Sequence, residues 1–93
     1  MIYLDNAATT GRKPETVIRA VNTALREYSA NPGRSGHRAS ERTALAVYSA
    51  REKAAQMFGA SGAENVVFTS GCTHSINAVV KGVLENGDRV IIS

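Results

Sequence analysis

The sequence contains very little cysteine, proline or aromatic residue. Of 93 residues, one is Cys, two are Pro, none is Trp, and Phe and Tyr together make up 5%. The single cysteine, Cys72, excludes an internal disulfide and a zinc finger, and it is typical of a reducing cytoplasm. His37 and His74 are not at metal-ligand spacing and have no Asp, Glu or Cys cluster around them, so no metal site is predicted.

Long apolar runs and an N-terminal signal pattern are also missing. No apolar stretch approaches the roughly 20 residues that cross a bilayer. The first residues do not show a basic segment followed by an apolar one. We therefore expect a cytoplasmic protein without a membrane partner.

Large apolar residues are scarce for a chain that must build its own core. Hydrophobic residues make up 43% of the sequence, but 14 residues are Ala and only 20 are Val, Ile, Leu or Phe. A chain of this length buries only roughly 60 to 65% of its unfolded surface. We predict a single unit whose fold is marginal when it stands alone.

Two amphipathic helices are predicted in the first two thirds of the chain. The first spans 14–28, where Pro14 suits the first turn and Glu15 complements the helix dipole. The second spans 40–58, with Ser40 as its N-cap and Gly59 as the left-handed residue after its end. Apolar residues recur in both at spacings of three and four.

The last third of the chain has the pattern of a βαβ unit. Val66–Thr69 and Val90–Ile92 are short β-branched runs that predict buried parallel strands. Between them, Ile76, Val79, Val80 and Val83 have helical spacing, and 86–88 end that helix. The predicted class is α/β, with an N-terminal arm, two helices and then a βαβ unit.

The turn 69–75 is the strongest candidate for a binding site. A strand that enters a helix through a glycine turn directs free backbone N–H groups and the positive end of the helix dipole at one point. Gly71 permits close approach, and Ser70, Thr73 and Ser75 add hydroxyl groups, so a phosphate is the expected ligand. The alternative is that Ser70 is simply the N-cap of an ordinary helix.

A second polar cluster lies in the loop between the first two helices. It contains Arg34, His37, Arg38 and Arg42. Such a cluster can bind the phosphates of a nucleic acid. However, no aromatic residues interleave with it and the net charge is only +3, so a solvated loop or one facing an acidic substrate is favoured and no nucleic-acid partner is expected.

Several short motifs in order make the chain resemble the beginning of a cysteine desulfurase, within the class V aminotransferases of the pyridoxal-phosphate enzymes of fold type I. The motifs are Tyr3–Thr10, Lys13-Pro14, Asn31–His37, Tyr48 with Ala50-Arg51, Phe58–Ala60, and Val67–Thr73 with Ile76-Asn77. The resemblance implies that residues 1–60 form an arm and two helices. It also implies that residues 61–93 begin the large-domain sheet that binds the cofactor.

The same resemblance assigns residues to a cofactor site and a substrate pocket. It implies that Gly71, Cys72 and Thr73 hold the phosphate of pyridoxal 5'-phosphate through backbone N–H groups and the Thr hydroxyl. It places Asn6, Ala7 and Ala8 near the substrate pocket, together with Arg34 and His37, whose loop often reaches the site from the second subunit of a homodimer. His74 stands where the family commonly has an acidic residue, and Cys72 does not match the sulfur-accepting cysteine.

The implied activity converts L-cysteine to L-alanine and passes sulfur to an enzyme cysteine as a persulfide. The family's Schiff-base lysine, catalytic cysteine, ring-stacking histidine, ring-nitrogen aspartate and carboxylate-binding arginine all lie beyond Ser93, so no catalytic residue is expected here. We expect the 93-residue chain to be an inactive N-terminal portion that binds the cofactor weakly or not at all. Alternatives are a selenocysteine lyase or other class V fragment, a stand-alone phosphate- or nucleic-acid-binding module, and a structural piece that pairs with a catalytic chain.

Overall fold

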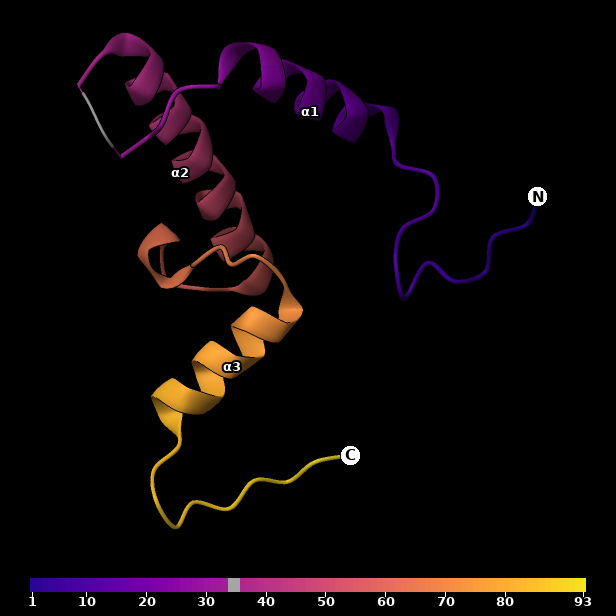
Figure 1. Ribbon diagram of the computed structural model, residues 1–93, viewed down its shortest axis with the longest axis vertical. Coiled ribbons are helices and arrows are strands. Elements are labelled where there is room, and N and C mark those ends of the chain that lie inside the picture. Colours follow the sequence, from indigo (N-terminus) through magenta and orange to yellow (C-terminus); the bar gives the residue numbers. More distant parts are fainter. Residues whose placement is uncertain (34–35) are drawn as a thin grey trace.

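The computed structural model describes residues 1–33 and 36–93, so the predicted pocket residue Arg34 lies outside the described residues. In chain order the elements are α1 (Glu15–Glu27), α2 (Arg38–Phe58), the short 3-10 helix η1 (Ala63–Asn65) and α3 (Cys72–Val83). Figure 1 shows α1 leading into the start of α2, and α3 continuing beyond the other end of α2. The three α-helices of the described residues therefore follow one another end to end and do not form a bundle.

Helix α1 confirms the helix predicted over 14–28. Pro14 stands directly before the first helical residue, and its carbonyl oxygen accepts hydrogen bonds from the N–H groups of Val17 at 3.0 Å and Ile18 at 3.2 Å. Glu15 lies in the first turn and Arg26 in the last, as the helix dipole favours. The helix ends before Tyr28, whose backbone leaves the helical region.

Helix α2 confirms the second predicted helix, but its N-cap is His37 and not Ser40. The Nδ1 atom of His37 accepts a hydrogen bond from the backbone N–H of Ser40 at 3.2 Å, so the helix begins two residues earlier than predicted. The prediction for the other end is confirmed, because Gly59 has a φ of 70° in the left-handed region. Histidine was missed because its ring nitrogen can replace the usual Ser or Asp oxygen as acceptor.

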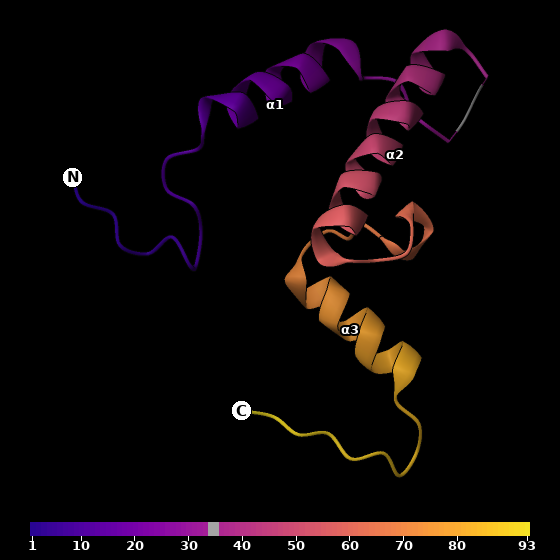
Figure 2. The same ribbon diagram turned by 180° about the vertical axis from the view of Figure 1, so that it is seen from behind.

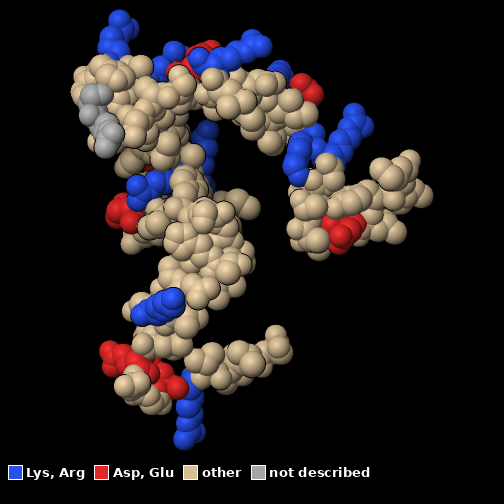
Figure 3. All heavy atoms as spheres, viewed as in Figure 1, with Lys and Arg blue, Asp and Glu red and all other residues tan. Residues whose placement is uncertain are grey.

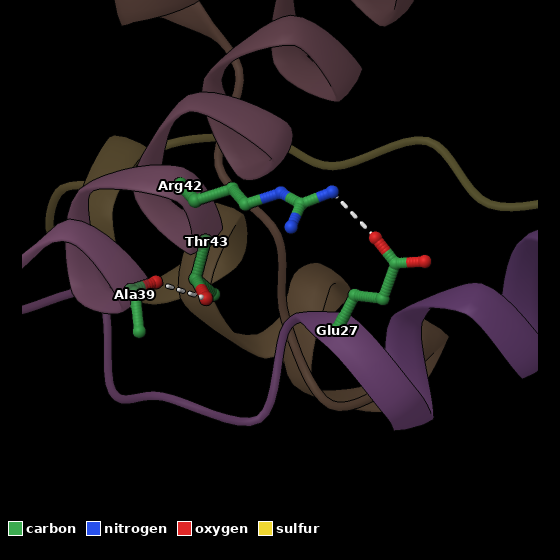
Figure 4. Close-up of polar contacts among 4 residues, drawn as sticks. All are labelled: Glu27, Ala39, Arg42 and Thr43. Carbon is green, nitrogen blue, oxygen red and sulfur yellow. Dashed lines mark hydrogen bonds and ion pairs between the residues drawn. The ribbon is translucent and has the colours of Figure 1, made fainter.

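The contact between α1 and α2 is polar. Arg42 on α2 donates to the carboxylate of Glu27 on α1 at 2.5 Å, and its guanidinium carbon lies 5.4 Å from the centre of the Tyr28 ring. Figure 4 shows the Arg42 side chain extending to Glu27, with Thr43 turned back to the carbonyl of Ala39. Both side chains of the ion pair are about half exposed, so the pair holds α1 only weakly.

The best packed part of the chain is the junction of α2 with η1. Ala55 on α2 and Ala63 on η1 are the buried apolar side chains among the described residues. The N–H of Ala60 donates to the carbonyl of Ala55 at 2.9 Å, and Arg51 Nε donates to the carbonyl of Val66 at 2.7 Å. These contacts fold the chain back against the last turns of α2 and set the point from which α3 starts.

The predicted βαβ unit is wrong, because residues 1–33 and 36–93 contain no strand. The helix of the unit is present as α3, and Val66 is extended with a φ of −116° and a ψ of 122°. A strand exists only when a second extended segment pairs with it, and Figure 1 shows the residues before α3 and the C-terminal tail at opposite ends of that helix. The Val66 carbonyl bonds to Arg51 instead, and Ile91 remains 97% exposed.

The chain is much less compact than a folded monomer of its mass. Its radius of gyration is 17.5 Å, against about 12 Å for a compact chain of this length. Its accessible surface is 8547 Å², against about 5,200 Å² for a folded monomer of this mass. Both views in Figures 1 and 2 show α1 and α3 well separated, and apolar residues such as Leu25 (74%) and Val83 (69%) face solvent. These helices lack the neighbours that would cover their apolar faces.

No helix in the described part of the chain is long and apolar enough to span a bilayer.

Candidate functional site

The first turn of α3 contains the residues that the sequence predicts as a phosphate-binding turn. Gly71 is the N-cap residue, and no side chain caps the first N–H groups among the described residues. The carbonyl of Gly71 accepts the first helical bond, from the N–H of Ser75 at 3.1 Å, so the N–H groups of Cys72, Thr73 and His74 precede the first helical bond. The alternative that Ser70 caps this helix is wrong, because Gly71 occupies that position.

Hydroxyl groups surround this turn and bond to one another. Thr69 Oγ1 lies 2.6 Å from Ser75 Oγ and donates to the carbonyl of Gly71 at 3.1 Å. Ser70 Oγ lies 3.1 Å from Nδ1 of His74. His74, which replaces an acidic residue in the resemblance, therefore helps to brace the turn.

The first turn of α3, which the structure describes in full, contains no Asp, Glu, Lys or Arg, and Lys81 lies in the last turn. Lys81 is nine positions after Cys72, which is about 13 Å along a helix axis. Figure 3 shows Lys and Arg scattered over the helices with Asp and Glu among them, rather than gathered on one face in that view. An anion here would be held by backbone dipoles and hydroxyl groups.

A hollow of about 330 Å³ lies beside the same turn. Its lining combines the hydroxyl groups of Thr69 and Ser75 with the apolar side chains of Val67, Ala78 and Val79. The free thiol of Cys72 is exposed at the first position of α3.

The predicted pocket residues of the N-terminal arm form a small closed loop. Asn6 Oδ1 accepts from the N–H of Gly11 at 3.2 Å, and Tyr3 Oη donates to the carbonyl of Thr9 at 2.8 Å. The Tyr3 ring lies against Gly11, where an added Cβ would be 2.6 Å from a ring carbon. The side chains of Ala7 and Ala8 are exposed on this loop.

The structure does not bring the predicted site residues together. Figures 1 and 2 show the N-terminal arm, the start of α2 with His37, and the start of α3 as three separate places. Among the described site residues, Gly71, Cys72 and Thr73 share one turn, and Asn6, Ala7 and Ala8 share another. The described residues also contain no group of three His, Cys, Asp or Glu side chains able to hold a metal ion.

Three residues make contacts that the sequence did not predict. Arg51 bonds to the segment that leads into α3, Tyr3 closes the arm loop, and Ser40 is buried at 1% exposure with its hydroxyl donating to the carbonyl of Asn31 at 2.7 Å. Each acts on a backbone carbonyl far along the chain or across a turn. Periodicity and motif spacing carry no signal for such contacts.

The sequence of the whole chain matches a known family. Residues 2–93 fit the model of the family described as aminotransferase class-V. The chain belongs to the class V aminotransferase family. The family depends on pyridoxal phosphate, and the uncapped backbone N–H groups at the start of α3 are donors of the kind that a phosphate accepts.

Individual relatives in this family are similar over the full length of the chain. A probable cysteine desulfurase of Vibrio cholerae is 33% identical over 100% of this chain and 24% of its own length. A cysteine desulfurase of Haloferax volcanii is 37% identical over 100% of this chain and 23% of its own length. A probable cysteine desulfurase of Methanothermobacter thermautotrophicus is 38% identical over 98% of this chain and 22% of its own length.

The chain thus spans about a quarter of the length of these curated relatives, and the matched part is their N-terminal part. No solved structure matches the chain significantly.

Proposed function

We propose that this chain provides the N-terminal quarter of a pyridoxal-phosphate-dependent cysteine desulfurase and contributes the anchor for the cofactor's phosphate. The observation that supports the anchor is the uncapped first turn of α3, with Gly71 at the N-cap and Thr73 within the turn. The names of the relatives favour desulfurase chemistry over the selenocysteine lyase reading, which shares the same family pattern.

In the proposed enzyme the cofactor, when bound, withdraws electrons from the amino acid substrate. The residues of this chain bind and orient. The N–H groups of Cys72 and Thr73 and the Thr73 hydroxyl hold the phosphate, and Gly71 leaves room for it. Asn6, Ala7, Ala8, Arg34 and His37 are proposed to reach the substrate pocket, the loop with His37 from the second subunit of a homodimer. L-Cysteine would yield L-alanine, with sulfur transferred to a cysteine supplied elsewhere in the enzyme.

The exposed surface of the chain supports this assignment. The apolar faces of α1 and α3, and the exposed Val90, Ile91 and Ile92, are suited to being covered by further secondary structure. Residues 61–93 are proposed to begin the cofactor-binding domain.

The anchor can be tested by titrating the ¹⁵N-labelled protein with inorganic phosphate and with pyridoxal 5'-phosphate while its amide resonances are recorded. We expect both ligands to bind weakly and to shift the amides of Cys72, Thr73 and His74 first. Borohydride treatment should fix no adduct on Lys81, which lies near the far end of α3. Shifts that centre on Arg38 and Arg42 instead would contradict the anchor and favour a general polyanion-binding module.

Two glycine substitutions separate ligand approach from helix stability. A Cβ at Gly71 or at Gly82 would meet no described atom within 4 Å. The backbone of Gly71 is extended, with a φ of 164°, and neither glycine is in the left-handed region. Gly71→Ala should therefore preserve α3 but weaken the phosphate response several-fold, because the methyl group stands where the ligand approaches. Gly82→Ala is the matched control, expected to strengthen the helix by about 0.5 to 1 kcal/mol and leave phosphate binding unchanged. Equal responses from both variants would refute the anchor.

A further inference from the structure

The loop before α2 contains a histidine whose two ring nitrogens have different tasks. Nδ1 of His37 lies 3.2 Å from the backbone nitrogen of Ser40. A backbone N–H can only donate, so Nδ1 must accept with its lone pair, and the proton of the neutral ring is on Nε2. Nε2 has no partner among the described residues, and the His37 side chain is exposed.

Ser40 ties this arrangement to the chain before the loop. Its hydroxyl donates to the carbonyl of Asn31 at 2.7 Å, and the side chain is 1% exposed. Asn31 Oδ1 in turn accepts from the N–H of Gly33 at 2.9 Å. The N–H of Ser40 therefore fixes the ring of His37, while its hydroxyl fixes the other end of the loop.

We propose that position 40 acts as a positioning residue through its backbone N–H, which commits His37 to act only as a hydrogen-bond donor, through Nε2. A ring held in this way cannot accept a proton at Nε2, and it can accept one at Nδ1 only by giving up the cap of α2. The partner of Nε2 must be a hydrogen-bond acceptor, such as a carboxylate oxygen or a thiolate sulfur. This assignment of His37 as a donor to substrate rests on the proposed function, whereas the cap and the position of the ring proton do not.

The protonation of the ring can be read by NMR of the protein labelled with ¹⁵N in histidine, with a His74→Gln variant to assign the two rings. We expect neutral His37 to show one fully protonated nitrogen, Nε2, and one fully unprotonated nitrogen, Nδ1. Ser40→Ala keeps the backbone N–H that bonds to Nδ1, so it should leave both signals in place. Averaged signals in the unsubstituted protein, or a proton on Nδ1, would overturn the proposal.

Two substitutions at His37 separate the capping role of Nδ1 from the donor role of Nε2. Asn places an oxygen near the position of Nδ1 and is a good N-cap, so His37→Asn should keep the hydrogen exchange of the Ser40 amide within about twofold of the unsubstituted value. His37→Gln places its amide near the position of Nε2 and loses the cap, so the Ser40 amide should exchange about fivefold faster relative to amides in the middle of α2.

These readouts contain neither cofactor nor substrate, so they can succeed or fail independently of phosphate binding at α3. If His37→Gln leaves the exchange of the Ser40 amide unchanged, the ring is not the cap and the proposal is wrong. If the cap and the tautomer are as expected but phosphate does not shift the amides at the start of α3, the proposed function is wrong and the assignment of the His37 ring proton still holds.

Discussion

The bond between Arg51 and the Val66 carbonyl offers the sharpest test of how the chain positions the start of α3. The Nε–O distance is 2.7 Å, and the contact is partly buried. A hydrogen bond from a charged donor contributes roughly 1.5 to 3 kcal/mol, and partial exposure favours the lower end. Arg51→Met removes the donor and keeps an apolar stem, so the folded-back segment should detach about tenfold more often.

Hydrogen exchange at the Ala60 amide measures this detachment, because that N–H donates to the carbonyl of Ala55 across the same junction. Amides in the middle of α2 serve as the internal reference. Lys53→Met is the matched control, since Lys53 lies on the same helix with an exposed side chain. We expect faster exchange at Ala60 in the Arg51 variant alone. An unchanged rate there would refute the view that Arg51 holds this segment.

Three further substitutions test individual contacts. Gly59→Ala should destabilise the end of α2 by about 1 kcal/mol, seen in thermal unfolding by circular dichroism, because alanine is strained at a φ of 70°. Gly11→Ala should displace the ring of Tyr3, which lies 2.6 Å from the site of the new Cβ, and alter the Tyr3 ring signals in NMR; an unaltered ring would contradict the closed arm loop. Glu27→Gln should cost less than about 1 kcal/mol in the same unfolding assay, because the pair with Arg42 is exposed, and a larger loss would mean that α1 depends on it.

The parts of the fold that were predicted correctly depend on neighbours in sequence. The first two helices follow from apolar residues three and four positions apart, and the end of α2 follows from Gly59. The turn before α3 was also predicted, because Gly71 and the helix after it are consecutive. By contrast, the cap by His37 and the bond from Arg51 depend on side-chain geometry that no residue pattern encodes.

The prediction of the two strands was wrong for a related reason. Val66–Thr69 and Val90–Ile92 have the β-branched composition of buried strands, but composition states only that a segment suits a sheet. The sheet itself requires a second backbone to satisfy each N–H and C=O, and Figures 1 and 2 show that the C-terminal tail stays beyond the far end of α3 and does not return beside the segment before that helix. The carbonyl of Val66 accepts a hydrogen bond from a side chain of α2, that of Arg51, and not from a strand. The pattern therefore predicts the environment that these segments require, not the structure they have among the described residues.

The same distinction applies to the candidate site. The free N–H groups of a helix start need only consecutive residues, so they are present in this chain at the start of α3. A substrate pocket needs the arm loop, the start of α2 and the start of α3 to converge, and no described contact joins these three places. Their convergence would have to come from surfaces that cover the apolar faces of α1 and α3, which are the faces left exposed. The phosphate anchor should therefore be measurable in this chain alone, whereas L-cysteine binding at Asn6 and His37 should require the larger assembly.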